Sequence, residues 1–304
     1  MRCDTVELRN PARGEAVVRV LAAPIHPADL NTIEGKYPGP AKLGREGVGQ
    51  VEELGPATAG PAPGTRVLLP PDLSTWCEAL ICPAIQLVPV PDKVAVEQAA
   101  TLRVNPGSAF RMLRDFVPLK SGEWLLQNAA NSAVGRAVIQ LSRAMGLRTV
   151  NLVRRLELFE PMRTAGADIV LMDDEQAAKE IREIVPDARL ALNAVGGESA
   201  LRLANALGEG GTLVTYGAMG RHPLRIPNGL LIFKDLRVAG FWLSRWIQRA
   251  TTPEKSAMLK ELLAYAERGV LHTEVEKTYR LSEFEAALEH ARQSERSGKI
   301  LFTA

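Results

Sequence analysis

The strongest constraint on the fold is a regular alternation of strand-like and helix-like segments that begins near residue 123. Residues 123–127 are typical of a short buried strand, residues 134–145 have the spacing of an amphipathic helix, and residues 149–153 are again strand-like. Further strand-like runs follow at 189–195, 211–216 and 236–242. Strands that alternate with helices predict βαβ units and a parallel sheet covered by helices on both faces.

The sequence on either side of this region has a different texture. Before about residue 104, short strand-like runs are separated by glycine and proline, as at Pro63-Gly64, and predict a compact β-rich unit. These runs occupy 15–22, 47–54, 66–69 and 76–82. The last stretch predicts a helix at 253–268, a strand at 274–279, a helix at 282–292 and a strand at 299–302. We expect it to rejoin the β-rich unit, so one domain comprises 1–104 with 243–304 and the other comprises 105–242.

The composition is that of a globular protein with a local functional site. The chain has 304 residues, twice the length of an ordinary domain of about 150, and is 46% hydrophobic and 24% charged. Lysine and arginine total 37 against 35 aspartate and glutamate, a net charge of +2. This balance gives no electrostatic reason to expect nucleic acid or an anionic membrane as the main partner.

The cysteines and the N-terminus indicate a reducing, cytoplasmic environment. The three cysteines, Cys3, Cys77 and Cys82, form no close CxxC pair, so neither a disulfide framework nor a structural zinc site is expected. The first residues contain no apolar signal core, and no run of about 18 apolar residues occurs without a charge. We predict a cytoplasmic protein; the mitochondrial matrix stays open, because a transit peptide that had been removed would not be visible in this sequence.

The loop after the strand at 123–127 has features of a dinucleotide-binding turn. Ala130 and Ser132 stand where the first two glycines of such a turn would be, and Gly135 keeps the third position. Small residues let the backbone approach a pyrophosphate at the positive end of the following helix. By itself the pattern also fits an alanine-rich helix start in any α/β protein. The strand before it and the helix after it favour a nucleotide site.

Two arginines at the end of the next strand bear on the choice of cofactor. Arg154 and Arg155 lie where a fold that prefers NAD would place an acid. A guanidinium there binds a 2′-phosphate through charge-assisted hydrogen bonds, whereas a carboxylate repels it. Two solvated arginines at a strand exit are the alternative interpretation. Taken with the preceding loop, Arg154 and Arg155 predict NADPH as the cofactor.

Several segments resemble the medium-chain dehydrogenase/reductase superfamily, and within it the trans-2-enoyl-thioester (enoyl-CoA) reductases of mitochondrial fatty acid synthesis and their bacterial relatives. The pairing of Asn-Ala-Ala-Asn-Ser at 128–132 with Phe-Trp-Leu-Ser at 241–244 is distinctive of that branch. The resemblance spans almost the whole chain and includes residues 24–31, 100–106, 127–135, 192–197, 214–219, 231–235 and 240–244.

The resemblance implies a fold, a reaction and an assembly. The fold is α/β, with a β-rich GroES-like catalytic domain (1–104 and 243–304) and a doubly wound parallel-sheet Rossmann NADP-binding domain (105–242). The reaction is hydride transfer from NADPH to C3 of a trans-2-enoyl thioester, an enoyl-CoA or enoyl-ACP, which reduces the C2=C3 double bond without zinc. The assembly is a homodimer whose nucleotide-domain sheets join edge to edge.

The same resemblance places the site residues. The catalytic residue falls on Tyr37. Cofactor contacts fall on Asn105, Asn131, Ser132, Ala133, Val134, Gly135, Arg154, Arg155, Tyr216, Gly217, Ala218, Met219, Phe241, Trp242, Leu243 and Lys299.

Three features depart from the family's pattern. Leu156 follows the two arginines where the basic cluster usually continues, which reduces the expected preference for NADPH over NADH. Arg45 stands where asparagine or histidine is usual, so the nearby pocket is expected to differ in shape. The first β-hairpin of family members has no counterpart before residue 15.

The reduction gives Tyr37 a specific task. Hydride on C3 leaves negative charge on the thioester oxygen, and C2 then needs a proton from a positioned weak acid. A phenol is such an acid near neutral pH. Without the resemblance, Tyr37 would be interpreted as a partly exposed aromatic residue in a loop that contains glycine and proline.

Residue types argue against a zinc-dependent dehydrogenase. Such an enzyme needs a cysteine near 23–26 and a histidine near 44–47, and neither is present. His26 is more often a hydrogen-bonded structural group than a ligand, and Cys77 and Cys82 are more often packing residues. We therefore predict no metal site.

Two other functions stay open. An NADPH-dependent quinone or enone oxidoreductase of the same superfamily would use the same cofactor loop without a dedicated proton donor, and a non-catalytic nucleotide-binding relative would keep only the fold. Trp242 and Trp246 are candidates to line an acyl channel, with core packing as the alternative. Arg111 and Arg114 are interpreted as a solvated helix face rather than an anion site.

Overall fold

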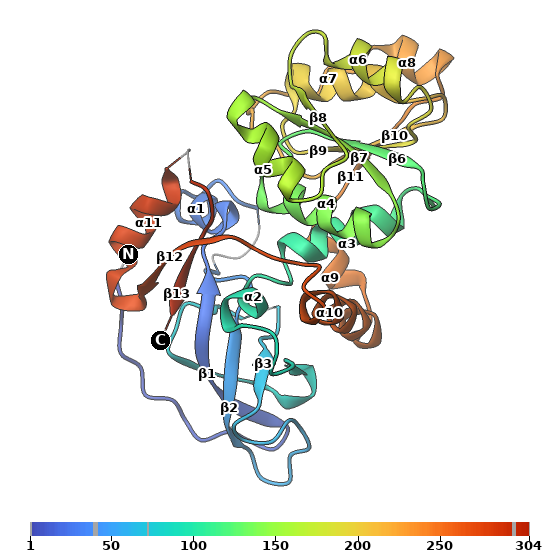
Figure 1. Ribbon diagram of the computed structural model, residues 1–304. Coiled ribbons are helices and arrows are strands. Elements are labelled where there is room, and N and C mark those ends of the chain that lie inside the picture. Colours follow the sequence, from blue (N-terminus) through green and yellow to red (C-terminus); the bar gives the residue numbers. More distant parts are fainter. Residues whose placement is uncertain (1, 39–41, 72, 294–295, 304) are drawn as a thin grey trace. The chain divides into compact units, whose positions relative to one another are not determined.

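The structure is a computed structural model that describes residues 2–38, 42–71, 73–293 and 296–303 (Figure 1). The chain divides into two compact units, which are described separately. The first unit comprises Met1–Gly107 and Ile247–Ala304, and the second comprises Ser108–Trp246. The boundaries expected from the sequence, after residues 104 and 242, lie three and four residues before these.

A seven-stranded sheet forms the centre of the first unit, in the order β12-β13-β1-β2-β3-β5, with β4 also paired to β1. Only β12 and β13 run parallel; the other pairs are antiparallel. The C-terminal stretch therefore returns to the sheet of the first unit. The strands are β1 (Glu15–Pro24), β2 (Val48–Leu54), β3 (Arg66–Leu68), β4 (Ala79–Pro83), β5 (Val88–Pro89), β12 (Val275–Arg280) and β13 (Lys299–Thr303).

Two apolar clusters hold this sheet. One contains alternate residues of β1 and β2, such as Val18 and Val51, which are at most 1% exposed. The other packs β13 residues Ile300 and Phe302 against the buried face of α11 (Phe284–Arg292), with Ile33 of α1 (Pro27–Ile33) beside it. This second cluster matters for the site because it fixes α1 and the start of β13. The remaining helices assigned wholly to this unit are α2 (Val96–Ala100) and α10 (Thr252–Glu267).

The second unit is built on a six-stranded parallel sheet in the order β11-β10-β9-β6-β7-β8. The chain proceeds from β6 outward through β7 and β8, then returns beside β6 as β9. Its strands are β6 (Trp124–Gln127), β7 (Arg148–Val153), β8 (Ile169–Met172), β9 (Leu190–Asn193), β10 (Thr212–Thr215) and β11 (Arg237–Gly240). The strand order reverses between β6 and β9, and open α/β sheets bind ligands at the carboxyl ends of the strands at such a point.

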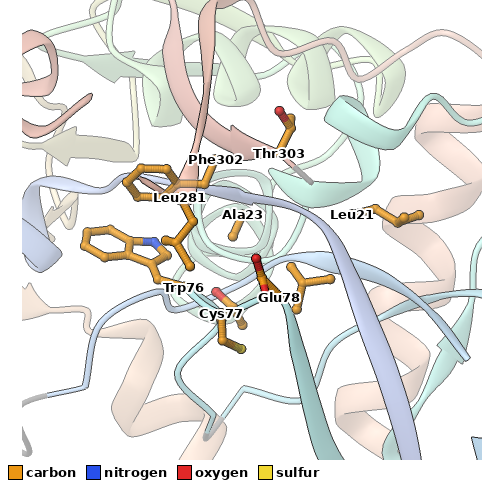
Figure 2. Close-up of a pocket in the computed structure, with 10 residues that line it drawn as sticks. Leu21, Ala23, Trp76, Cys77, Glu78, Leu281, Phe302 and Thr303 are labelled. Atoms are coloured by element: carbon orange, nitrogen blue, oxygen red, sulfur yellow. The ribbon is translucent and has the colours of Figure 1, made fainter. Parts of the chain in front are cut away.

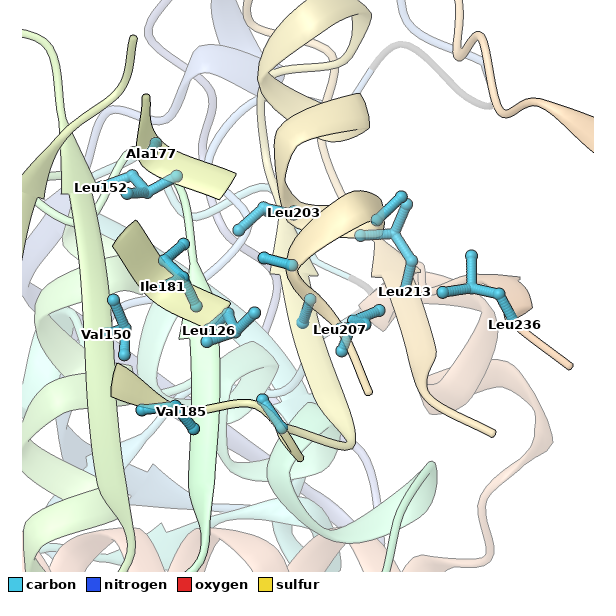
Figure 3. Close-up of a cluster of buried hydrophobic side chains, with 14 residues drawn as sticks. Leu126, Val150, Leu152, Ala177, Ile181, Val185, Leu203, Leu207, Leu213 and Leu236 are labelled. Atoms are coloured by element: carbon cyan, nitrogen blue, oxygen red, sulfur yellow. The ribbon is translucent and has the colours of Figure 1, made fainter. Parts of the chain in front are cut away.

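Helices cover both faces of this sheet (Figure 1). On one face, Ile181 and Leu203 pack with Leu126 and Leu152 in a buried cluster (Figure 3). On the other face, Ile139 and Met162 pack with Val153 and Val170. The helices are α4 (Ala133–Ala144), α5 (Phe159–Thr164), α6 (Ala177–Ile184), α7 (Gly197–Ala206) and α8 (Asn228–Phe233), while α3 (Asn105–Asp115) and α9 (Leu243–Arg249) cross the unit boundaries.

The predicted strands correspond closely to the observed ones, with one clear exception. The strand expected at 76–82 begins only at Ala79, because the Trp76 indole nitrogen donates to the Pro24 carbonyl oxygen at 3.3 Å and its ring packs on Phe302. No helix in the described residues is long and apolar enough to span a bilayer.

Candidate active site and nucleotide-binding site

Asp29 organises the segment that carries Tyr37. The last residue of β1 leads into His26, the N-cap of α1, and Pro27 occupies the first helical position. The Asp29 Oδ2 atom accepts from the His26 N–H at 2.9 Å, and its Oδ1 atom accepts from the Gly44 N–H at 3.1 Å. Asp29 is fully buried, and burial raises the pKa of its carboxyl group, with His26 and Arg45 acting in the opposite direction. This carboxylate therefore joins the start of α1 to the loop before β2.

A buried chain of charged groups lies beside Asp29. His26 Nε2 is 2.7 Å from Glu46 Oε1, and Lys299 Nζ is 3.1 Å from His26 Nδ1. The other Glu46 oxygen accepts the N–H groups of Arg103 and Val104 at 2.7 and 2.9 Å. Burial lowers the pKa of Lys299 to about 8, although Glu46 and Asp29 favour its charged form. Lys299 was predicted to contact the cofactor; here its amino group is buried and also donates to the Ile25 carbonyl oxygen at 3.1 Å.

Tyr37 is half-buried and contacts Arg45. The Arg45 guanidinium carbon lies 4.3 Å from the centroid of the Tyr37 ring. Arg45 Nη2 donates to Thr32 Oγ1 at 2.8 Å, and Arg45 Nε is 3.5 Å from Asp29 Oδ1. The departure from the family's pattern at residue 45 therefore places a positive charge against the predicted proton donor.

In the second unit, the loop between β6 and α4 has the geometry of a phosphate-binding turn. Ser132 caps α4, and its Oγ accepts from the Gly135 N–H at 3.1 Å. A Cβ atom at residue 135 would lie 2.5 Å from the Ala130 carbonyl oxygen, so only glycine fits there. The helix N-terminus, with its positive dipole end, is formed by Ser132, Ala133 and Val134.

The same sheet edge carries polar side chains at the ends of β6 and β9. Asn128 Nδ2 donates to Asn193 Oδ1 and Ser199 Oγ, both at 2.8 Å, and Asn128 Oδ1 accepts from the Ala194 N–H at 2.8 Å. This pair of asparagines joins the carboxyl ends of β6 and β9, where the strand order reverses. The sequence analysis did not assign it a role; the available signal was an asparagine at or directly after each of two parallel strands.

Tyr216, which follows β10, reaches the same edge. Its hydroxyl is buried near Ser132 without a hydrogen bond of ordinary geometry, and burial raises its pKa, with Ser132 acting in the opposite direction. Gly217 is close-packed, since a Cβ atom there would lie 2.9 Å from the Ala194 carbonyl oxygen. A buried hydroxyl and a close backbone approach beside a helix N-terminus fit a bound dinucleotide.

The other predicted cofactor residues have varied environments. Arg154 and Arg155 are exposed after β7, with Arg155 Nε 3.4 Å from Glu157 Oε1. Asn105, in the first unit, is buried, and its Nδ2 atom has no hydrogen-bond partner in the part of the chain described. The remaining ones are Asn131, Ala218 and Met219, which are exposed, Phe241 and Trp242, which are half-buried, and Leu243, which is buried.

His26, Cys77 and Cys82, the residues considered as metal ligands in the sequence analysis, make other contacts. Within residues 2–38, 42–71, 73–293 and 296–303, no three His, Cys, Asp or Glu side chains are grouped to hold a metal ion. Burial raises the pKa of the Cys77 thiol to about 11 and that of Cys82 to about 12, so both are neutral thiols near pH 7. Arg111, predicted to lie on a solvated helix face, is half-buried; it pairs with Asp115 and lies over the Trp246 ring.

A small pocket in the first unit lies apart from the predicted residues. Figure 2 shows the residues that line it, which come from β1, β13 and the segment before β4, with Trp76, Cys77 and Phe302 among them. None of the predicted catalytic or cofactor residues lines this pocket. It therefore does not identify the active site.

Comparisons with known proteins now decide the family. The alcohol dehydrogenase GroES-like domain model matches residues 12–92, and the zinc-binding dehydrogenase model matches residues 133–262. The mitochondrial enoyl-[acyl-carrier-protein] reductase of Caenorhabditis elegans is 41% identical over 294 residues, which cover 93% of this chain and 84% of that protein. The chain belongs to the mitochondrial enoyl-[acyl-carrier-protein] reductase family. The predicted family and fold class are thereby confirmed.

Solved structures agree with this assignment. A complex of Etr1p with NADP and crotonyl-CoA matches with a TM-score of 0.88 at 26% identity, covering 99% of this chain and 93% of that one. An Etr1p/Etr2p heterodimer of 2-enoyl thioester reductase from Candida tropicalis matches with a TM-score of 0.87 at 27% identity, covering 97% and 92%. A mycobacterial quinone oxidoreductase at 24% identity, with a TM-score of 0.88 and coverage of 100% and 95%, shares the fold.

Proposed function

We propose that this enoyl-reductase family member reduces the C2=C3 double bond of a trans-2-enoyl thioester with NADPH and without zinc. The observation that carries the proposal is Tyr37 itself: a half-buried phenol held against a guanidinium in a chain that matches enoyl reductases over almost its full length. The Etr1p complex, with NADP and crotonyl-CoA bound, supports the same cofactor and substrate class.

The second unit supplies the cofactor site. The α4 N-terminus from Ser132 to Gly135 binds the pyrophosphate, and Arg154 binds the 2′-phosphate. NADPH, when bound, supplies the hydride that adds to C3 of the substrate. The buried Tyr216 hydroxyl and the close approach at Gly217 line the same sheet edge.

The first unit supplies the proton. As hydride adds to C3, negative charge develops on the thioester oxygen; the Tyr37 hydroxyl then gives its proton to C2, and the phenolate that remains is reprotonated from solvent. C3 thus receives a hydride, which amounts to two electrons and one proton, and C2 receives the second proton from the Tyr37 phenol. A positioned acid of this kind contributes about 100- to 10,000-fold to the rate.

A Tyr37→Phe variant tests the proposal. We expect turnover of crotonyl-CoA to fall by about 100-fold or more, because the phenyl ring keeps the packing and removes the proton. The dissociation constant for NADPH, measured by nucleotide fluorescence, should stay within about twofold of the wild-type value. Unchanged turnover of crotonyl-CoA would falsify the assignment of Tyr37.

The second candidate is an NADPH-dependent quinone oxidoreductase, since a quinone oxidoreductase shares the fold. That reaction needs no dedicated donor at C2. Retention of quinone reduction by the wild type and by Tyr37→Phe, with no enoyl-thioester turnover in either, would favour it. NADPH binding without reduction of any activated alkene or quinone would favour a non-catalytic relative.

We further propose that two copies of the chain join along β11. This strand is at the edge of the second unit's sheet, and Val238 on it is 42% exposed. On α8, just before it, Ile232 is 68% exposed and Phe233 85%. An open edge beside exposed apolar side chains fits a partner strand, so Phe233→Glu should convert a dimer to a monomer in analytical ultracentrifugation. A monomeric wild type would contradict this.

The relatives are named as mitochondrial enzymes. A cytoplasmic location for this chain stays a prediction, with the mitochondrial matrix as its alternative.

A further inference from the structure

We propose that Arg45 is a positioning residue for the proton transfer: its guanidinium fixes the Tyr37 ring and stabilises the negative charge that develops on the phenol oxygen. The inference rests on the proposed function, in which Tyr37 gives the proton to C2. Arg45 is one of the positions at which this chain departs from the pattern expected from the family resemblance.

The contact has the geometry of a cation–π interaction. The guanidinium carbon lies 4.3 Å from the ring centroid, inside the limit of about 6 Å for such contacts. The Arg45 side chain is 20% exposed, so water screens its charge less than that of a fully exposed arginine. The Tyr37 N–H donates to the Asn31 carbonyl oxygen at 3.2 Å, which fixes the backbone of the tyrosine to the end of α1.

The guanidinium itself is held from the opposite side. Its Nη2 atom donates to Thr32 Oγ1 at 2.8 Å, and that hydroxyl donates to the Ala28 carbonyl oxygen at 2.7 Å. Its Nε atom is buried, 3.5 Å from Asp29, and has no hydrogen bond to any of the residues that the structure describes. Asp29 is fixed by the His26 and Gly44 N–H groups, so the position of Arg45 depends on its contacts with Thr32 and Asp29 of α1.

This arrangement acts on the step in which charge appears. The phenol is neutral before proton transfer and negative after it, so a nearby positive charge stabilises the later state more than the earlier one. Two charged side chains just before Tyr37, Lys36 and Glu34, pair with each other at 2.8 Å. We therefore expect Arg45 to affect kcat rather than KM.

A double-mutant cycle tests the inference. Arg45→Gln keeps a side chain able to donate to Thr32 and removes the charge; it should lower kcat for crotonyl-CoA by about 3- to 30-fold, the range of a cation–π contact, with KM within about twofold. In a Tyr37→Phe background the same change should cause no further loss. Arg45→Lys should recover part of the rate because it keeps the charge.

The outcomes separate the inference from the function on which it rests. Equal losses from Arg45→Gln with and without the Tyr37 hydroxyl would mean that Arg45 acts only through the fold, and the inference would be wrong. Full activity of Tyr37→Phe would instead overturn the proposed function. If Arg45→Gln does not fold, as judged by thermal unfolding, Thr32→Val replaces it. Loss of the hydroxyl that holds the guanidinium should give a smaller decrease in kcat, again only when Tyr37 is present. An equal decrease with and without the Tyr37 hydroxyl overturns the inference.

Discussion

The candidate sites in the two units are built by different means. At the edge of the parallel sheet, the predicted nucleotide loop between β6 and α4 depends on backbone: a glycine that no other residue can replace, a capped helix and close approaches of main-chain atoms. Beside Tyr37, the site depends on charged side chains that come from β13, the start of α1 and the loop before β2. A backbone site is visible as a local pattern of small residues, whereas a charge network joins positions far apart in the sequence.

The largest expected effect concerns Gly135, in the loop between β6 and α4. Gly135→Ala would place a Cβ atom 2.5 Å from the Ala130 carbonyl oxygen, and the other two nearest atoms also belong to the Ala130 main chain, which leaves little room to adjust. We expect the affinity for NADPH to fall by about a thousand-fold, equal to about 4 kcal/mol, because the loop must move away from the pyrophosphate. Isothermal titration with NADPH measures the loss.

A matched glycine provides the control. Gly229 lies in α8, where an added Cβ would meet only a side-chain atom of Phe233 at 3.8 Å. Gly229→Ala should therefore bind NADPH as the wild type does. Wild-type affinity in Gly135→Ala would show that the loop does not need the close approach and would remove the contrast between the two units.

The charge network predicts a pH dependence of stability. The pKa of Lys299 is lowered from 10.5 to about 8 in the folded state, mainly by burial. Between these two values the unfolded chain binds more protons than the folded chain, so stability rises with pH across this window. The contribution is about 3 kcal/mol, gained as the pH rises from about 8 to 10.5 and absent below it.

Lys299→Met isolates this contribution. The free energy of unfolding, measured in urea at pH 7 to 10, should rise with pH more steeply in the wild type than in the variant. Lys277→Met is the control, since that lysine is exposed on β12. Parallel curves for the wild type and Lys299→Met would show that the buried amino group titrates as it does in the unfolded chain.

The fold was predictable from the sequence because each strand has a local signal. The runs at 123–127 and 149–153 correspond to β6 and β7 within one residue at each end. The strand β8 was not identified; it is a four-residue run, and only Val170 of it is buried. The early residues of the expected strand at 76–82 were wrong because the Trp76 side chain makes tertiary contacts that no local pattern contains.

The candidate site was predictable only in part. The nucleotide loop could be inferred from Ala130, Ser132 and Gly135, because small residues before a helix have a direct geometric reason. Tyr37 depended on the family resemblance, since one tyrosine in a loop has no local signature. The sequence marked Arg45 only as a departure from the family's pattern. Its contact with Tyr37 could not be predicted, because cation–π pairs across a loop have no sequence period.

A smaller expected effect tests whether the charge of a side chain also contributes to NADPH binding in the second unit. Arg154 is exposed after β7, and within the described residues no ion pair or hydrogen bond of its side chain is found. Arg154→Asp should weaken NADPH by about 30-fold, equal to about 2 kcal/mol, because it replaces a charge-assisted hydrogen bond with repulsion of the 2′-phosphate. The affinity for NADH, which lacks that phosphate, should change little. Equal losses for both cofactors would refute the assignment of the 2′-phosphate to Arg154.

The smallest effect separates the helix cap from the close approach at Gly135. Ser132→Ala removes the oxygen that accepts from the Gly135 N–H at 3.1 Å and leaves the backbone path free. Loss of an N-cap side chain costs about 1 kcal/mol, so the free energy of unfolding without NADPH should fall by about that amount, while the affinity for NADPH should not fall. The bound pyrophosphate takes over the freed N–H, and this compensation should make the loss in thermal stability smaller with saturating NADPH than without it. An equal loss in both conditions would mean that the pyrophosphate does not reach the α4 N-terminus, and the loop would then be a structural turn like any other helix start in this sheet.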